Sequence, residues 1–212
     1  MDYKILTSTI EFKELEKDWK IIEKKSDNIT FFSTYEYCYT WWKAHQNNPK
    51  YKLWIICTYQ NNKLAAIAPF MLEKKTQILK TNIILRFLAR ADYHDFLIDN
   101  EIIAKPEKTI KKIFTIIEEN QGLWDEICLT HIDSKSILTH FLLKSKYNPN
   151  LEYLIENPFI NTAKYLDYND FFNRCIPSKA KQYAKRLKKK TNYSLTVSND
   201  NLMDTFSQLH IS

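Results

Sequence analysis

The segment between Ile83 and Ile98, in the middle of the chain, is rich in apolar residues. The run from Ile83 to Leu88 predicts a buried β-strand, and a second β-branched and aromatic run follows after a polar break at residues 90–92. The flanking segments predict a hairpin upstream and two helix-then-strand units downstream. We therefore expect a central sheet with this segment in its middle.

Helical spacing of apolar residues predicts two amphipathic helices near the N-terminus. The first begins at Ser8, where Glu11 three residues later completes a capping box. The second begins at Ser33 and carries an aromatic stripe that includes Trp41 and Trp42. Such a stripe is typical of core packing. The alternative is a wall of a substrate groove, with both tryptophans in contact with substrate.

Two strands joined by a tight turn follow these helices. Residues 51–59 and 64–72 are rich in β-branched and aromatic side chains, and the two asparagines between them tolerate the left-handed conformation of a hairpin turn. Pro69 lacks an N–H, which predicts an edge position or a bulge. The polar residues 73–77 predict a loop.

The second half of the chain alternates between predicted helices and strands. Pro106 opens a helix that ends ahead of Gly122, and a strand follows. His131 ends that strand and His140 lies within the next helix, and both positions are typical of structural histidines. The elements expected after Gly122 are a strand at 124–132, a helix from 133 or 134 to 144, short strands at 151–155 and 162–166, a helix opened by Pro177 and Ser178, a strand at 193–197 and a last helix from 199 or 200.

The composition is that of a soluble globular protein. The chain has 212 residues, of which 44% are hydrophobic, and its mean hydropathy is −0.45. We expect neither a signal peptide, because the second residue is acidic, nor a membrane span, because no apolar run approaches ~20 residues. This favours a cytoplasmic location. The four cysteines are widely separated, so we expect reduced thiols and no metal site.

A single glycine, Gly122, stands where average usage of about 7% gives roughly fifteen. Loops that cradle phosphates need glycine, because the backbone must approach the ligand closely and adopt positive φ. These 212 residues therefore hold no P-loop, no dinucleotide-binding fingerprint and no glycine-rich acyl-CoA loop.

Positive charge is concentrated in one segment. Residues 171–199 hold eight Lys or Arg and no Asp or Glu, so removing these eight charges from the net +6 leaves −2 for the rest. The helix SKAKQYAKRLKKK suits the phosphates of an RNA, of CoA or of an anionic lipid surface. The alternatives are a solvated face or a linker that docks on the acidic part. The candidate anion-binding residues are Lys181, Lys185, Arg186, Lys188 and Lys189.

The order of these segments is similar to that of a known family. The chain resembles the CelD-like branch of the GNAT acetyltransferases, a branch associated with bacterial cellulose biosynthesis and similar in its doubled layout to the FemAB-type aminoacyltransferases. The resemblance rests on an opening helix ending in a Trp, followed by FFSTYEYCYTWW, LAAIAPFML, LRFLARADYHDFLI, SKAKQYAKRLKKK and FSQLH.

This resemblance implies an α/β (α+β), GNAT-like fold with a mixed, mostly antiparallel central sheet flanked by helices. It implies an N-terminal lobe at residues 1–170, a basic linking helix at 171–192 and the start of a second lobe at 193–212, where the acyl-donor site mostly lies. The helical pattern runs to Ser212, so we expect a truncated second lobe that a separate chain completes. A docked C-terminal helix is the alternative.

The implied activity is N-acyl transfer to an amine acceptor from acetyl-CoA or another acyl-CoA, with no metal, and aminoacyl-tRNA as the donor stays open. Such transfer needs a base for the amine, and Asp92, His94 and Asp95 are the catalytic candidates, with Tyr93 as a substrate-binding donor. These side chains converge only if the break interrupts the strand alternation. The alternatives are a turn whose carboxylates bond backbone amides and, for the whole chain, a non-catalytic binding or assembly module.

Overall fold

The computed structural model describes residues 1–27, 29–77, 80–154, 156 and 160–190. It divides the chain into two units, Met1–Leu154 and Ile155–Ser212. The strands of the first unit are β1 (Asp2–Leu6), β2 (Tyr51–Gln60), β3 (Lys63–Gln77), β4 (Lys80–Phe87), β5 (Leu97–Ile98) and β6 (Glu126–Ile127). Its α-helices are α1 (Thr9–Glu14), α2 (Glu16–Glu23), α3 (Tyr35–His45), α4 (Pro106–Glu119) and α5 (Ile137–Lys144).

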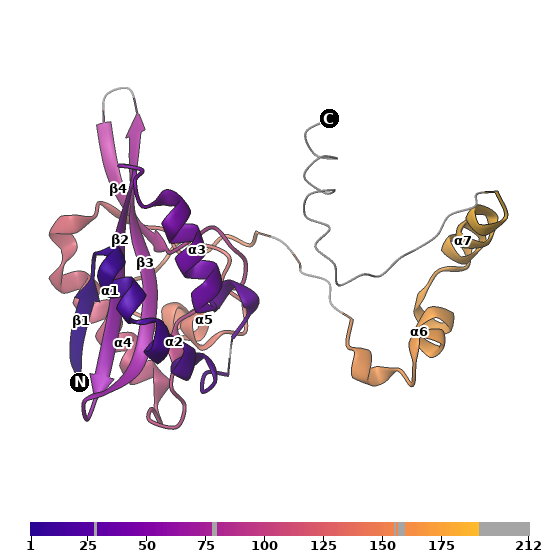
Figure 1. Ribbon diagram of the computed structural model, residues 1–212, viewed down its shortest axis with the longest axis horizontal. Coiled ribbons are helices and arrows are strands. Elements are labelled where there is room, and N and C mark those ends of the chain that lie inside the picture. The colour runs from indigo at the N-terminus through magenta and orange to yellow at the C-terminus, as the bar shows by residue number, and fades with distance from the viewer. Residues whose placement is uncertain (28, 78–79, 155, 157–159, 191–212) are drawn as a thin grey trace. The chain divides into compact units, whose positions relative to one another are not determined.

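The first unit is a mixed sheet with helices on both faces (Figure 1). The strand order is β1-β2-β3-β4-β6, and β5 lies beside β3. The β4–β6 pair is parallel and the other pairs are antiparallel. The predicted fold class, a mostly antiparallel central sheet flanked by helices, is confirmed.

Strand β2 shows why the sheet is covered twice. Its buried residues alternate between the two cores, because successive side chains of a strand point to opposite faces. Leu53 and Ile55 pack with α1, α2 and α3, whereas Trp54 and Ile56 pack with α4 and α5. A strand buried on both faces reads as a continuous apolar run, which is the pattern of this segment.

Strand β3 exchanges one neighbour for another at Pro69. Residues 66–67 pair with β5, whereas residues 70–77 pair with β4. The Leu88 N–H donates to the Pro69 carbonyl (2.8 Å). The Pro69 nitrogen faces the same neighbour but carries no hydrogen, so it cannot donate the second hydrogen bond of the pair. The β3–β4 ladder therefore stops at Leu88. The sequence predicts an edge position or a bulge at Pro69. Strand β3 is not an edge strand, but Pro69 lies in the gap between its neighbours β5 and β4, where the ladder pairs it with β2 alone.

Between β4 and β5 the chain leaves the sheet and returns to it. Both strands pair antiparallel with β3, so they lie on one line, and residues 88–96 form an excursion between them. This confirms the predicted strand, polar break and second run. The outer edge of β5 is held by Ser26, whose Oγ accepts a hydrogen bond from the Ile98 N–H (2.9 Å).

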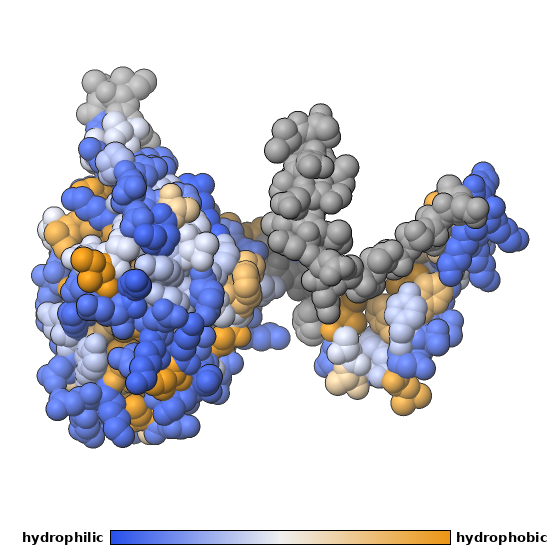
Figure 2. All heavy atoms as spheres, in the orientation of Figure 1, coloured by the Kyte–Doolittle hydropathy of each residue, from blue (hydrophilic) through white to orange (hydrophobic). Residues whose placement is uncertain are grey.

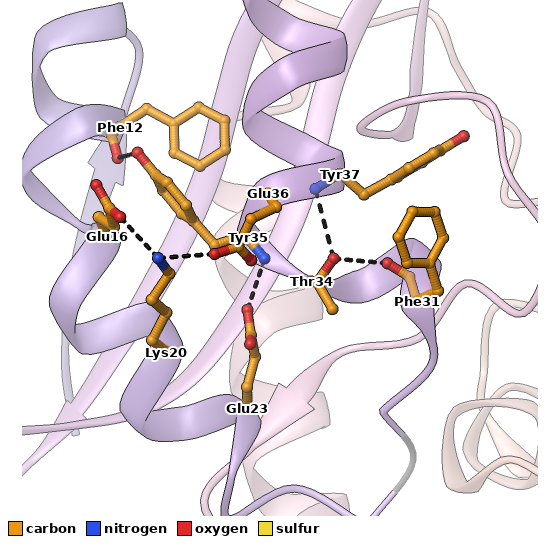
Figure 3. Close-up of polar contacts among 9 residues, drawn as sticks. All are labelled: Phe12, Glu16, Lys20, Glu23, Phe31, Thr34, Tyr35, Glu36 and Tyr37. Atoms are coloured by element: carbon orange, nitrogen blue, oxygen red, sulfur yellow. Dashed lines mark hydrogen bonds and ion pairs between the residues drawn. The ribbon is translucent and has the colours of Figure 1, made fainter. Parts of the chain in front are cut away.

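The helix starts follow local capping chemistry. The capping box of Ser8 and Glu11 is present as predicted. The second helix begins one residue later than expected, because Thr34 caps it and Ser33 belongs to a preceding 3-10 turn, η1 (Phe31–Ser33). Figure 3 shows how α2 holds this start: Lys20 pairs with Glu16 and Glu36, and Glu23 accepts the Tyr35 N–H (2.6 Å).

Four predicted elements differ in the structure. Residues 73–77 continue β3 rather than forming a loop, because they pair with β4 in a hairpin that extends beyond the helices (Figure 1). Within 124–132, only Glu126–Ile127 is a strand, since β4 alone pairs with it. Residues 151–154 form no strand, and Thr162–Lys164 is a 3-10 turn, η3.

The second unit contributes two described α-helices, α6 (Tyr168–Cys175) and α7 (Ser178–Lys190). Helix α7 is the predicted basic helix, and α6, capped by Asp167, was not expected. The predicted strand at 193–197 and the last helix lie outside the described residues, so the division at 170 and 192 stays a prediction. No helix among the described residues is long and apolar enough to cross a membrane.

Candidate functional site

An open cleft of about 640 Å³ lies beside the excursion. Its charged strand residues lie on the face of the sheet that α1, α2 and α3 share, because Glu73 and Lys75 follow Met71 on one face of β3 and Arg86 lies opposite Met71 on β4. We call it the basic cleft, and the lining residues used below are Phe32, Lys50, Glu73, Lys75, Arg86, Arg90, Asp92, His94, Cys128 and His131.

Left-handed backbone turns shape the wall of the basic cleft. Ala89, Tyr93 and His131 have φ values of 71°, 55° and 59°. A residue with a Cβ is uncommon in this region, where the conformation costs about 1–2 kcal/mol. The strain is carried where the chain leaves the sheet after β4 and β6, and strained backbone of this kind gathers at functional sites.

Glu73 is the electrostatic centre of the cleft. Its carboxylate is only 8% exposed, yet it pairs with Lys50 and Arg86 at 2.7 Å each and with Arg90 at 3.6 Å. Burial raises the pKa of a carboxyl, but the Lys50 hydrogen bond and the charges of Arg86, Lys50 and Arg90 outweigh it and hold the pKa of Glu73 below its usual value. Glu73 is therefore an anion at neutral pH.

The lining charges leave the cleft positive. Lys50, Lys75, Arg86 and Arg90 oppose two carboxylates, those of Glu73 and Asp92, which is an excess of two positive charges. The Arg90 side chain is 72% exposed and is the most weakly held of the cations around Glu73. Such a cleft attracts an anionic group.

His94 is a buried, neutral member of the cleft. Its ring stacks on Phe87 with centroids 4.8 Å apart, and its backbone N–H donates to the His131 carbonyl (2.9 Å). Burial first, and then the neighbouring His131, lower the pKa of His94 to about 4, against a smaller opposing effect of Asp92. At neutral pH His94 is uncharged and fixes the backbone that presents His131.

His131 and Asp92 face each other across the mouth of the cleft. The His131 Nε2 lies 3.9 Å from the Asp92 Oδ1, and both side chains are about half exposed. This is longer than a hydrogen bond, but histidine beside carboxylate is the arrangement of a general base and its orienting group, and such pairs often tighten when a ligand binds.

The structure separates the predicted site residues. Asp92 and His94 line the cleft, whereas Tyr93 and Asp95 do not. Asp95 is buried and its Oδ1 accepts the Phe96 N–H (2.8 Å), which is the turn role that the sequence left open. The catalytic role predicted for Asp92, His94 and Asp95 stays a prediction.

The two predicted substrate-binding tryptophans lie away from the cleft. Trp42 is buried in the α1–α3 core and donates through Nε1 to Thr9 Oγ1 (2.9 Å). Trp41 stacks on His45 with centroids 4.0 Å apart. Both make contacts of core packing, which the sequence favoured. In the second unit, the predicted anion-binding residues all lie on α7, which is exposed and largely hydrophilic (Figure 2).

Sequence reasoning missed most of the charged lining. Glu73 and Lys75 were assigned to a loop, and Arg86 was counted only as part of a strand. His131 was interpreted as structural. One signal in the sequence could have found it. His131 stands at the end of the predicted strand 124–132, and strand ends that lie at the same edge of a sheet bring their side chains together.

The turn ahead of α4 does not fit a phosphate group. Backbone N–H groups at a helix start are a common phosphate cradle, but here the Glu101 and Ile102 N–H groups donate to Asp99 Oδ1 (2.9 and 3.2 Å). Asp99 is itself a buried carboxylate. The described residues thus offer no backbone cradle for an acyl-CoA at this helix. No group of three or more His, Cys, Asp or Glu within the described ranges is placed to hold a metal.

Comparisons with known proteins give partial structural similarity. No protein-family model and no curated protein matches the chain. Similar solved structures include a GNAT family acetyltransferase from Staphylococcus aureus (14% identity, TM-score 0.42, 74% of this chain and 100% of that chain). A possible acetyltransferase from Clostridium difficile is another, with 11% identity, a TM-score of 0.43 and coverage of 74% of this chain and 97% of that chain. An aminoglycoside 6′-N-acetyltransferase from Acinetobacter haemolyticus is a third, with 9% identity, a TM-score of 0.43 and coverage of 76% of this chain and 99% of that chain. At these values the likeness fixes neither substrate nor catalytic residues.

Replacing His94 with glutamine is expected to make unfolding less sensitive to acid. The folded pKa is about 4, against about 6.5 in an unfolded chain. Between those values the unfolded chain takes up a proton that the folded chain does not. Wild-type stability is therefore complete above about pH 6.5 and falls by on the order of 3 kcal/mol toward pH 4.

Urea unfolding followed by tryptophan fluorescence measures this difference, because all five tryptophans lie in the first unit. The control is His140→Gln, which changes an exposed histidine and keeps the wild-type acid dependence. An acid dependence in His94→Gln as steep as that of the wild type would show that His94 is not the buried titrating group.

Proposed function

We propose that the first unit is the acceptor-binding part of an N-acyltransferase and that the basic cleft holds the amine. The observation that carries this proposal is the His131–Asp92 pair, which faces the open cleft. Histidine is the most frequent general base in enzymes, and a neighbouring carboxylate orients its imidazole. The order of sequence segments, which resembles that of GNAT acetyltransferases, supports the same reaction.

The residues of the cleft have separate roles in this proposal. Acyl transfer to an amine forms an N–C bond, breaks the bond between the acyl carbon and its leaving group, and releases a proton from the amine. His131 accepts that proton at Nε2, and Asp92 stabilises the imidazolium that results. His94 holds the His131 backbone through its own N–H. Glu73 keeps the cations of the cleft in place.

The identity of the acyl donor is supported only by the sequence resemblance. Acetyl-CoA or another acyl-CoA would supply an activated acyl group. The described backbone ahead of α4 does not cradle its phosphates, which agrees with a donor site that lies mostly in a second lobe. The CelD-like assignment, the tandem lobes and a second chain that completes the second lobe remain predictions.

Exchanging His131 for asparagine is expected to lower kcat/KM for amine acetylation by about 10²–10⁴-fold, the usual contribution of a general base. Asparagine tolerates the left-handed backbone at this position, so the fold is retained. The assay follows release of the CoA thiol from acetyl-CoA with a set of primary amines. His140→Gln is the matched control and keeps full activity.

Two results would contradict the acyltransferase proposal. One is equal activity of His131→Asn and wild type. The other is a wild-type chain that neither turns over nor binds any amine in the set.

As a second function, we propose that α7 contacts an anionic partner. The observation that favours it is a 13-residue helix with seven Lys or Arg, no acidic residue and an exposed Tyr183. Each phosphate contact to a single strand contributes about 0.7 to the slope of log K against log salt. Changing Lys185, Arg186, Lys188 and Lys189 to glutamine is expected to reduce that slope by about 3, measured with a uridine homopolymer.

The matched control changes four exposed lysines of the first unit, Lys13, Lys17, Lys24 and Lys52, and leaves the slope unchanged. Binding that does not depend on salt, or a slope that the α7 changes leave intact, would exclude a phosphate partner for this helix.

A further inference from the structure

Three aromatic side chains form a cluster at the edge of the basic cleft. Phe31, Phe32 and Tyr37 contact one another edge to face, with ring centroids 5.3 to 5.8 Å apart. Phe32 lines the cleft, whereas the Phe31 ring is 68% exposed. Figure 3 shows Phe31 and Tyr37 on the same side of the start of α3. The neighbours of Phe31 hold its ring in place and leave much of it open to a ligand.

This cluster is attached to the loop that carries the most exposed cation. The Tyr37 hydroxyl donates to the Arg90 carbonyl (2.9 Å). The 3-10 turn that presents Phe31 is closed by Thr34, whose Oγ1 donates to the Phe31 carbonyl (2.7 Å) and caps α3. The aromatic surface and the Arg90 loop are therefore held in a fixed relation before any ligand arrives.

Arg90 has charge available for a ligand. Glu73 is already paired with Lys50 and Arg86 at 2.7 Å, and Arg90 lies farther away at 3.6 Å with an exposed guanidinium. A guanidinium binds a carboxylate through two parallel hydrogen bonds. Two residues further along the same loop, Asp92 faces His131. An anion subsite, a base and an aromatic surface thus surround one cleft.

We propose that the acceptor is an aromatic amino acid or a close relative, an amine that carries both a carboxylate and a planar ring. Its carboxylate binds Arg90, its amine faces His131 and its ring packs on Phe31 and Phe32. The inference rests on the proposed acyl transfer for the role of the amine, but the recognition itself needs no donor. It concerns which ligand enters the cleft.

The experiment is calorimetric titration of the full chain, without any acyl donor, with three probes. L-phenylalanine carries all three groups, L-phenylalaninamide lacks the carboxylate and L-alanine lacks the ring. Phenylalanine is expected to bind saturably and at least about tenfold more tightly than either of the others, since a charge-assisted hydrogen-bonded pair contributes about one power of ten or more.

Two variants assign the preference to its residues. Arg90→Gln is expected to abolish the preference for phenylalanine over its amide, and Phe31→Ala the preference over alanine. Both side chains are largely exposed, so the fold is retained. The matched controls are Arg174→Gln, an exposed arginine of the second unit, and Tyr153→Ala, an exposed aromatic residue at the end of the first unit. Each control leaves both preferences unchanged.

The possible outcomes separate this inference from the proposed function. The acceptor class is overturned if L-phenylalanine does not bind, or if L-phenylalaninamide or L-alanine binds as tightly as L-phenylalanine. Arg90→Gln that weakens acetyl-CoA binding and leaves phenylalanine binding intact overturns it as well, by assigning Arg90 to the donor. Phenylalanine binding in the expected order without turnover of any amine supports the acceptor class and contradicts acyl transfer. Turnover of other amines without phenylalanine binding supports acyl transfer and contradicts the acceptor class.

Discussion

The missing N–H of Pro69 is the constraint on which the rest of the first unit depends. At this residue β3 faces a strand that donates to it but receives no hydrogen bond in return, so the β3–β4 ladder ends. Ala89 then takes the left-handed conformation and carries the chain out of the sheet. The sheet is interrupted between two buried cores, and the polar side chains of the excursion line the cleft beside it.

The charges around Glu73 keep that interruption ordered. A buried carboxylate is costly unless it is paired, and here three cations from different segments pair with it. The same pairing ties the start of β2, strand β4 and the excursion to one point. The cations exceed what Glu73 neutralises, so the network that holds the cleft together also makes it positive. The residues that order the cleft therefore also set its charge.

The sequence predicts those features that depend on local rules. The capping box at Ser8, the two-asparagine turn and the basic helix α7 all follow from neighbours a few residues apart. The start of α3 was misplaced by one residue, because Ser33 and Thr34 are equally good caps and only the preceding 3-10 turn decides between them. Asp92 and His94 were found because they are adjacent in sequence.

The rest of the site could not be read in the same way, because it joins distant segments. Glu73 looked like a loop residue, since nothing local shows that a polar stretch pairs with β4. His131 meets Asp92 through the parallel β4–β6 pair and through the hydrogen bond from the His94 N–H to the His131 carbonyl. The most direct test of the cleft as a ligand site is backbone amide NMR of the full chain with added L-phenylalanine. Shifts confined to residues 31–37, 88–94 and 130–131 are expected, whereas shifts centred on α7, or no shifts at all, would contradict a ligand site in the basic cleft.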